Sequence, residues 1–523
     1  MKSLLTGLVL AGSLAFAGAA NAETLTIMRG ADAAHYDPHR ALPVVTSEVV
    51  FMMGDTLVAM DPDMKRVHPL LAKSWDVSAD GLTYTFNLRD DVSFCSGKKM
   101  TSADVVYSFE RMLEPGKPRP SVQKMGKVKS VRAAGPYTVV YELAEAWNEL
   151  LPHLALMHGT ILNKENVEAL GNDFGIKGFD GTGPYCWESW TPRNQLVLKR
   201  HDAYRWGPAI YNNRGPAKFD TVIWKVVPEE QTRVAAMLTG QADVSSYLPN
   251  SSIAQLSSAP TVNVTKVPNY YRTCFFGFKI IRDQVADVRV RKAMNMAINR
   301  PDIAKAVFFG NAQPATTLLH PGTQDYYPPS AEPLSKLDIE GAKKLLDEAG
   351  WKTGSDGWRY KDGQKLEPLL IHLTVGTTPG MAVAAQGMLR QIGVDLRVQA
   401  LDSTVFFSRW AQQDYDLFAL CNPYFSAGDV LNVYWRSDGV PVPNNMMWRD
   451  PETDAWLDAG KQAKTPADRA AAYAKVQQKI SENAVWMPLV FDDIFVVANK
   501  KLKGVTTHAI FTCPLYKGLD LSY

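Results

Sequence analysis

The sequence predicts an α/β protein built from two lobes. Its 523 residues are too many for one compact hydrophobic core, so the chain divides into at least two lobes. Between residues 368 and 420, strand-like apolar runs alternate with a helical pattern, and this β–α–β order is typical of an α/β lobe. No flexible linker, internal repeat or low-complexity segment is apparent. We therefore expect the lobes to exchange strands rather than to hang from a tether.

Residues 1–22 are predicted to be a signal peptide and not part of the fold. Lys2 supplies the positive charge, a short apolar core follows, and Ala20-Asn21-Ala22 is a cleavage site of the A-x-A kind. Cleavage after Ala22 is expected to release a mature chain that begins at Glu23. No cysteine lies at the cleavage site, and no later segment is apolar for long enough to be transmembrane. The pattern predicts a free periplasmic protein.

The stretch Ala72–Arg111 carries the clearest local patterns. A tight turn over Ser78–Gly81 precedes alternating apolar residues in Leu82–Leu88, which is the period of a half-buried strand. Thr101 then opens a helix, with Asp104 completing a near capping box. A hairpin followed by a helix occurs in many α+β domains, so periodicity alone indicates nothing more specific.

The identities of these residues are more specific than their spacing. The matching positions include Ser74, Trp75, Asp80, Gly81, Tyr84, Phe86, Arg89, Thr101, Asp104 and Arg111. The string resembles the signature region of the family 5 bacterial extracellular solute-binding proteins, the receptors of dipeptide, oligopeptide, nickel and glutathione uptake transporters. Cys95 replaces the usual histidine, so the resemblance assigns it no role. Gly181–Tyr185 and Asp287–Pro301 match further hallmarks of the family, and together the three cover essentially the whole mature chain.

The resemblance implies a two-lobe periplasmic binding protein fold of the class II, or cluster C, type, with an extra sub-domain in the first lobe. We expect lobe I to comprise residues 23–64, 181–283 and 494–523, with residues 65–180 inserted as the sub-domain, and lobe II to comprise residues 284–493. In the family the chain crosses twice between the lobes. We place these crossings near Ile280–Val288 and Asp492–Val496.

Composition and motifs argue against several other function classes. Lysine and arginine nearly balance aspartate and glutamate, 56 against 54, so we expect no nucleic-acid partner. There is no GxSxG or HExxH motif, and the nine histidines are scattered without a nearby nucleophile and orienting acid. There is no GxGxxG or P-loop lysine either. We predict a binding protein without a cofactor rather than an enzyme.

The cysteines and histidines do not indicate a metal site. Five cysteines lie in the mature chain, Cys95, Cys186, Cys274, Cys421 and Cys513. They form no CxxC and no Cys/His metal spacing. Export permits disulfides, but the pairing cannot be deduced from sequence, so each cysteine is predicted to be a small buried side chain. His35 and His39 share one turn, and such a pair is more often structural or solvated than metal-binding.

Loops of both lobes are expected to contact the solute, as the resemblance implies. Arg272 has a planar guanidinium that suits a ligand carboxylate, with a surface arginine as the alternative. In peptide receptors an aspartate pairs with the amino terminus of the ligand. Asp429 falls near that position in a loop, where a turn-forming role is the alternative. The predicted contacts are His35, Tyr36, Tyr247, Tyr271, Arg272, Trp410, Tyr424, Asp429, Asn432 and Trp435.

The mechanism implied by the resemblance is hinge closure, in which two lobes trap a solute and the closed receptor docks on permease subunits of an ABC importer. We predict a monomeric periplasmic receptor for a peptide or a similar polar, amine-bearing solute. The alternative ligands are an opine or sugar conjugate, glutathione or a metal chelate. From other classes, the alternatives are an exported enzyme on the same scaffold and a chaperone-like or signalling receptor.

Overall fold

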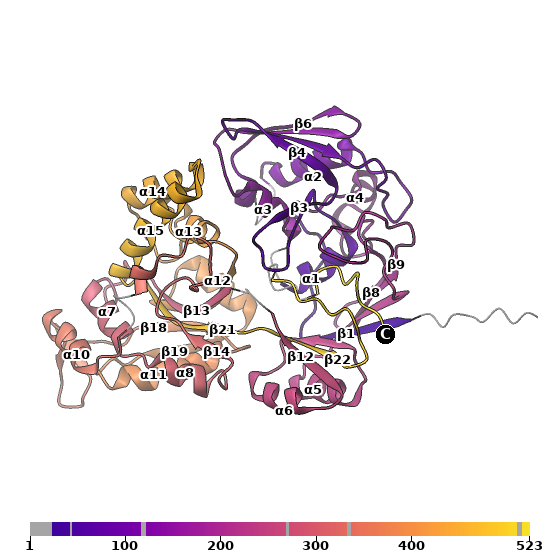
Figure 1. The fold of residues 1–523 in the computed structure, drawn as a ribbon. Coiled ribbons are helices and arrows are strands. Elements are labelled where there is room, and N and C mark those ends of the chain that lie inside the picture. Colours follow the sequence, from indigo (N-terminus) through magenta and orange to yellow (C-terminus); the bar gives the residue numbers. More distant parts are fainter. Residues whose placement is uncertain (1–22, 42–43, 117–121, 268–270, 332–335, 510–514) are drawn as a thin grey trace, which may run out of the picture.

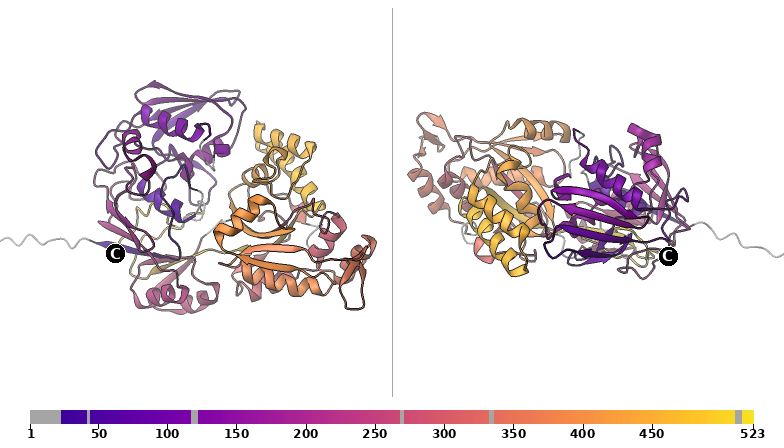
Figure 2. Two further views of the ribbon diagram at one scale, coloured as in Figure 1. Left: turned by 180° about the vertical axis from the view of Figure 1, so that it is seen from behind. Right: turned by 90° about the horizontal axis from the view of Figure 1, so that it is seen from above.

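Two lobes lie side by side in the computed structural model, joined by two passages of the chain (Figure 1). The structure describes residues 23–41, 44–116, 122–267, 271–331, 336–509 and 515–523. The predicted signal peptide and Cys513 lie outside these ranges. We call the body built on a seven-stranded sheet lobe I and the body built on a six-stranded sheet lobe II. Views from behind and from above show the same two bodies (Figure 2).

The sheet of lobe I combines strands from both ends of the chain. Its strand order is β12-β22-β11-β1-β10-β9-β8. Strand β1 pairs in parallel with β10 and β11, whereas β22 lies antiparallel between β11 and β12. The strands are β1 (Thr24–Arg29), β8 (Tyr185–Thr191), β9 (Gln195–Arg200), β10 (Thr221–Val226), β11 (Val244–Ser246), β12 (Val262–Lys266) and β22 (Phe495–Asn499). The helices α1 (Val44–Met53), α5 (Glu230–Thr239) and α6 (Ile253–Ser258) accompany this sheet.

A second sheet in lobe I has the antiparallel order β4-β5-β7-β6. Its strands are β4 (Ala72–Val77), β5 (Thr83–Leu88), β6 (Val128–Gly135) and β7 (Thr138–Leu143). Helix α2 (Ser102–Leu113) begins at the predicted capping box, where the backbone N–H of Thr101 donates to Asp104 Oδ2 over 3.0 Å. The apolar side chains of both sheets belong to one hydrophobic cluster, so the predicted sub-domain shares a core with the rest of lobe I. Shorter elements here are β2 (Val58–Met60), β3 (Val67–Pro69), the 3-10 helix η1 (Val122–Met125), α3 (Leu150–Leu154) and α4 (Lys164–Leu170).

Lobe II is a six-stranded mixed sheet with helices on both faces, as the β–α–β pattern predicts. The strand order is β14-β21-β13-β20-β18-β19, and β18 runs parallel to β19 and β20. One face packs on α7, α8, α10 and α11, and the other on α12 to α15. The strands are β13 (Tyr271–Phe278), β14 (Ala312–Pro314), β18 (Leu369–Leu373), β19 (Arg397–Leu401), β20 (Leu417–Tyr424) and β21 (Trp486–Asp492). The helices are α7 (Val288–Met296), α8 (Arg300–Ala306), α10 (Ile339–Glu348), α11 (Thr378–Arg390), α12 (Ser403–Gln412), α13 (Ala427–Tyr434), α14 (Pro451–Gln462) and α15 (Pro466–Glu482).

The first crossing between the lobes lies earlier than the sequence places it. Strand β12 belongs to the sheet of lobe I, and β13 pairs with β20 and β21 of lobe II. The chain therefore crosses between Lys266 and Tyr271, not near Ile280–Val288, and it returns between β21 and β22. Both β12 and β13 have strand patterns, and a strand pattern does not reveal which sheet a strand joins. Tyr271 and Arg272 consequently belong to lobe II.

Four of the five cysteines form disulfides, which corrects the prediction that each is only a small buried side chain. Cys95, in the loop before α2, is bonded to Cys186 of β8, and Cys274 of β13 is bonded to Cys421 of β20. The partners are 91 and 147 residues apart in sequence. Only the assembled sheets bring them together, so spacing along the chain carries no signal of the pairing.

The glycines of the Gly181–Tyr185 hallmark lie against the C-terminal end of α1. A Cβ atom at Gly183 would lie 2.5 Å from the carbonyl oxygen of Met52, and a Cβ atom at Gly181 would lie 2.1 Å from that of Met53. The backbone N–H of Gly183 also donates to the carbonyl of Met53 over 2.8 Å. These glycines permit a close backbone approach to the helix.

Replacing Gly183 by alanine is expected to lower the free energy of unfolding of lobe I by about 1–3 kcal/mol, because the new methyl group overpacks this contact. Urea unfolding followed by tryptophan fluorescence measures the change. The matched control is Gly387→Ala in α11, where a Cβ atom meets nothing within 4 Å. That variant should be neutral or more stable by up to about 1 kcal/mol, because alanine favours helix. A Gly183→Ala protein as stable as the wild type would contradict the close approach.

Candidate functional site

The two passages between the lobes are flanked by charged side chains. Arg272, at the start of β13, donates from Nη1 to Asp492 Oδ2 over 3.0 Å, and Asp492 ends β21. Burial raises the pKa of Asp492, and the positive charge of Arg272 partly offsets this. Lys266 lies 2.6 Å from Asp493, at the return passage. These pairs hold both passages where the backbone leaves one sheet and enters the other.

Two of the predicted tyrosines lie beside Arg272, on neighbouring strands of lobe II. Tyr271 and Tyr424 are register partners on β13 and β20. The hydroxyl of Tyr424 bonds Thr273 Oγ1 at 2.7 Å and accepts from the backbone N–H of His320 at 2.8 Å. The ring of Tyr271 stacks on His320, with centroids 4.9 Å apart. Burial raises the pKa of Tyr271, and Lys65 of lobe I opposes this, so Tyr271 is within electrostatic reach of lobe I.

A second contact joins the lobes through the N-terminal end of α13. Asp429, with a side chain 3% exposed, places Oδ1 3.2 Å from Lys124 Nζ of η1 and 3.9 Å from His153 Nε2 of α3. The hydroxyl of Ser426 donates to Glu149 Oε1 over 2.5 Å. Phe425 joins the hydrophobic cluster of lobe I, and its ring lies 5.1 Å from that of His153. We call the contact of Lys124, Glu149 and His153 with Ser426, Gly428 and Asp429 the α13 contact.

The C-terminal end of α14 adds further contacts between the lobes. The amide of Asn148 donates to the carbonyl oxygens of Gly460 and Ala463, over 3.0 and 3.2 Å. The ammonium of Lys461 lies 5.2 Å from the ring centroid of Trp147. Lobe I thus contacts lobe II both at the two passages and at the N-terminal end of α13.

Asp429 lies in helix α13, which corrects the prediction that it lies in a loop. Ser426 is the N-cap of α13, and its side chain accepts from the backbone N–H of Asp429 over 3.0 Å. The signal for this helix is Ser-x-x-Asp, the same near capping box that begins α2 at Thr101. One turn later, Asn432 donates to the carbonyl of Gly428 at 2.9 Å and to the hydroxyl of Tyr473 at 3.2 Å.

Tyr36 lies in the hydrophobic core of lobe I, and Trp435 lies in that of lobe II. Tyr36 is fully buried, accepts a hydrogen bond from Arg29, and donates to Asp32 Oδ1 over 3.0 Å. Trp435 is fully buried beside Trp448 and Trp486. Their positions favour a structural role.

The other three predicted contacts are less buried. His35 is half-buried, and its Nδ1 accepts from the backbone N–H of Asp37 at 3.3 Å. Tyr247, with φ of 55°, packs on the core of lobe I. Trp410 packs on Phe406 and Phe418 in lobe II. Ligand contact by the ten residues stays a prediction, and Tyr271, Arg272, Tyr424 and Asp429 are the ones that lie where the lobes meet.

Three residues at the α13 contact are not among the predicted ones. Lys124, Glu149 and His153 come from short elements of lobe I without a distinctive motif. Their partners in lobe II are more than 250 residues away in sequence, since Glu149 and Ser426 are separated by 277 residues. Burial raises the pKa of Glu149 to about 7, the bond from Ser426 opposes this, and the charge of Asp429 adds to it.

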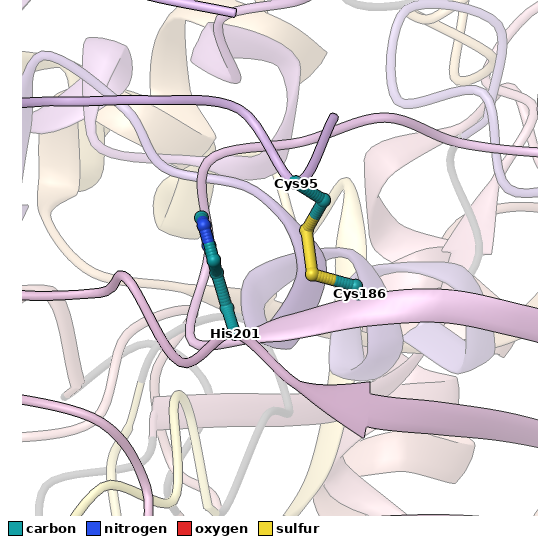
Figure 3. Close-up of side chains that lie close together, drawn as sticks. All are labelled: Cys95, Cys186 and His201. Carbon is teal, nitrogen blue, oxygen red and sulfur yellow. A yellow bond between two sulfur atoms is a disulfide. The ribbon is translucent and has the colours of Figure 1, made fainter. Parts of the chain in front are cut away.

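One group of three potential metal ligands occurs in the described part of the chain. The ligand atoms of Cys95, Cys186 and His201 lie within 4.8 Å of one another. Figure 3 shows the ring of His201 beside the disulfide of the two cysteines. A sulfur atom in a disulfide offers no thiolate, and metals bind the thiolate. His201 Nδ1 lies 2.9 Å from the carbonyl oxygen of Gly183. The group is therefore a disulfide packed on a hydrogen-bonded histidine.

Comparison with known proteins relates this geometry to one family. The model of "Bacterial extracellular solute-binding proteins, family 5 Middle" matches residues 66–440. The glutathione-binding protein GsiB of Salmonella paratyphi A is 25% identical over 520 residues, which cover 96% of this chain and 95% of that protein.

Solved structures share the fold. The periplasmic binding protein DppA of Helicobacter pylori, in complex with the peptide STSA, has a TM-score of 0.83 and 24% identity, covering 95% of this chain and 97% of that chain. NikZ of Campylobacter jejuni, in complex with Ni(L-His), has a TM-score of 0.81 and 23% identity, covering 96% and 99%. The two-lobe α/β fold predicted from the sequence is confirmed. Within the described ranges, no helix combines the length and the hydrophobicity that a bilayer crossing requires.

Proposed function

Because the chain belongs to the family 5 bacterial extracellular solute-binding proteins, we propose that it is the receptor of an ABC importer for a peptide or a similar polar, amine-bearing solute. The solute binds between the lobes, and its higher affinity for the closed form drives closure. The closed receptor then delivers it to the permease subunits. The observation that carries this proposal is that polar side chains of two otherwise separate lobes meet at the α13 contact.

The chemistry at these meeting points supports a solute with a positive group. Asp429 and Asp492 are buried carboxylates close to where the lobes meet. Buried carboxylates pair readily with ammonium groups. The names of the relatives point the same way, because glutathione is a tripeptide and DppA holds a peptide. At the passages, Tyr271, Arg272 and Tyr424 are our candidates for contact with the polar backbone of the solute.

We place the mature protein in the periplasm as a monomer. Cleavage after Ala22 gives a chain that begins at Glu23, and the intact mass of the exported protein tests this boundary. Light scattering coupled to size-exclusion chromatography tests the monomeric state.

Gentle native mass spectrometry of the signal-free protein is expected to reveal a retained mass in the range of a di- to pentapeptide. Closure around a solute slows its release, so part of the solute survives purification. In a thermal-shift assay, a peptide at a hundred times its dissociation constant is expected to add about 2.7 kcal/mol to stability. Protein that has been unfolded, dialysed and refolded is the control, since it should lose the retained mass and regain it when the peptide is added.

A single mass that matches an opine or a metal chelate would contradict the peptide class while keeping the receptor. A chain that retains no mass and gains no stability from peptides, glutathione, opines or nickel chelates would contradict the proposed function. Hydrolysis of a peptide added to the purified protein would favour the exported enzyme instead.

A further inference from the structure

The α13 contact contains a carboxyl group buried between the two lobes. Glu149 precedes α3 in lobe I and is 5% exposed. Its Oε1 accepts from Ser426 of lobe II, and its Oε2 has no hydrogen-bond partner among the described residues. A buried carboxylate without full hydrogen bonding is costly, and the same group in its neutral form is much less so.

Gly428 makes this insertion sterically possible. A Cβ atom at Gly428 would lie 2.1 Å from Glu149 Oε2 and 2.8 Å from the hydroxyl of Tyr473. The carboxyl group therefore packs directly on the backbone of α13, and no solute fits between them. In this part of the interface, the two lobes contact each other directly.

We propose that Glu149 is a proton-binding latch: the α13 contact forms with uptake of one proton at Glu149, so that closure of the lobes is favoured as the pH falls. The inference rests on the hinge closure of the proposed function and adds a regulation to it. It depends on the protein geometry alone and does not require that the solute be known.

The direction of this pH dependence follows from the difference in the surroundings of Glu149 between the open and the closed arrangement of the lobes. When the contact is broken, Glu149 faces water and has the ordinary pKa of 4.5, and burial in the contact raises the pKa to about 7. A group whose pKa is raised on closure binds its proton more tightly in the closed form. The contribution of Glu149 to closure is therefore weakest above pH 7 and grows about tenfold per pH unit from there to pH 4.5, or roughly 300-fold in total.

The charged groups around Glu149 come from every element packed on it. Lys124 of η1 pairs with Asp429 of α13, and the negative charge of Asp429 raises the pKa of Glu149 further. Arg469 of α15 lies 2.6 Å from Asp325. The positive charge of Arg469 lowers the pKa of Glu149 and the negative charge of Asp325 raises it, so their effects on Glu149 oppose each other. Tyr473 of α15 stays uncharged, because burial raises its pKa.

His153 of α3 opposes the effect of Glu149. Burial lowers the pKa of His153 well below its ordinary value of 6.5, and Lys124 adds to this. If opening exposes the imidazole, closure below pH 6.5 requires loss of its proton. The response of Glu149 is therefore measured either at pH 8, where the imidazole is neutral in both arrangements, or in a His153→Gln background.

The test is single-molecule FRET between dyes on azido amino acids at Val77 and Val383, exposed residues of lobe I and lobe II. Solute-free, refolded protein is used. At pH 8, Glu149→Gln is expected to shift the equilibrium toward the closed arrangement by roughly 300-fold, since it mimics the protonated group. Gly428→Ala is expected to shift it toward the open one, while its helix is retained because alanine favours helix. Glu168→Gln, an exposed glutamate of the same lobe, is the matched control and should change nothing.

In the His153→Gln background, the closed fraction is expected to rise as the pH falls from 8 to 5, and Glu149→Gln should abolish this rise. A Glu149→Gln protein with the wild-type distribution at pH 8 would overturn the inference, as would a closed fraction independent of pH in the His153→Gln background. Gly428→Ala protein that closes like the wild type would also overturn it. A chain that binds no solute but shows these shifts would contradict the proposed function and leave the latch in place.

Discussion

Replacing Lys517 by methionine is expected to lower the free energy of unfolding of lobe I by about 3–5 kcal/mol. The ammonium of Lys517 is fully buried and lies 2.5 Å from Asp55 Oδ1. It also donates to the carbonyl oxygens of Phe51 and Gly54, over 3.0 and 3.1 Å. Methionine keeps the apolar stem but leaves the carboxylate of Asp55 buried without a cation, which is the costly way to break a buried pair.

Urea unfolding at pH 7.5, followed by tryptophan fluorescence, measures this loss. Trp206 donates to Asp55 Oδ2 over 2.9 Å, so its emission reports on the site. The double variant Asp55→Asn/Lys517→Met should recover part of the loss, because no unpaired charge remains. The surface control Lys164→Met removes an exposed pair with Glu168 and should change stability by less than about 0.5 kcal/mol. An exposed ion pair contributes at most about 1 kcal/mol. A Lys517→Met protein whose free energy of unfolding lies within about 1 kcal/mol of the wild-type value would therefore contradict the role of the buried charge.

Removing the disulfide between Cys95 and Cys186 with a double alanine variant is expected to cost about 2–5 kcal/mol of stability. The bond closes a loop of 91 residues, so most of its effect comes from restricting the unfolded chain. Hydrogen bonds hold the same loop in the folded state, since Cys95 N–H donates to the carbonyl of Gly181 and Ser96 N–H to Asp180, both over 2.9 Å. The folded geometry should therefore survive the substitution.

Unfolding with and without a reductant measures the effect, and reduction should destabilise the wild type more than the double variant. Alkylation of the unfolded, unreduced mature chain provides a direct count of thiols. Two disulfides use four of the five cysteines, so one alkylated cysteine, Cys513, is expected. Five alkylated cysteines would show that neither bond forms.

Local patterns predicted the elements well where one signal dominates. The capping box at Thr101 and the half-buried strand within Leu82–Leu88 each depend on neighbouring residues. The overall fold followed from the family resemblance, because hallmarks spread over the chain describe one architecture.

Pairings between distant residues could not be predicted in this way. The disulfides, the crossing before β13, and the pair of Lys124 with Asp429, which are 305 residues apart, arise only when the sheets and lobes assemble. Helix α13 is a different case, because its start is marked in the sequence by the Ser-x-x-Asp signal at Ser426. The predicted strand that ends near Leu420 is followed by residues with a loop-like composition, and this composition obscures the helix signal.

The insertion of β22 between β11 and β12 has a consequence for biogenesis. A chain that emerges from its N-terminus presents β11 and β12 long before β22, so their facing edges remain unpaired until the last part of the chain arrives. Lobe II is contiguous in sequence from β13 to β21 and can complete its sheet first. The sheet of lobe I can therefore be completed only after the last part of the chain is available.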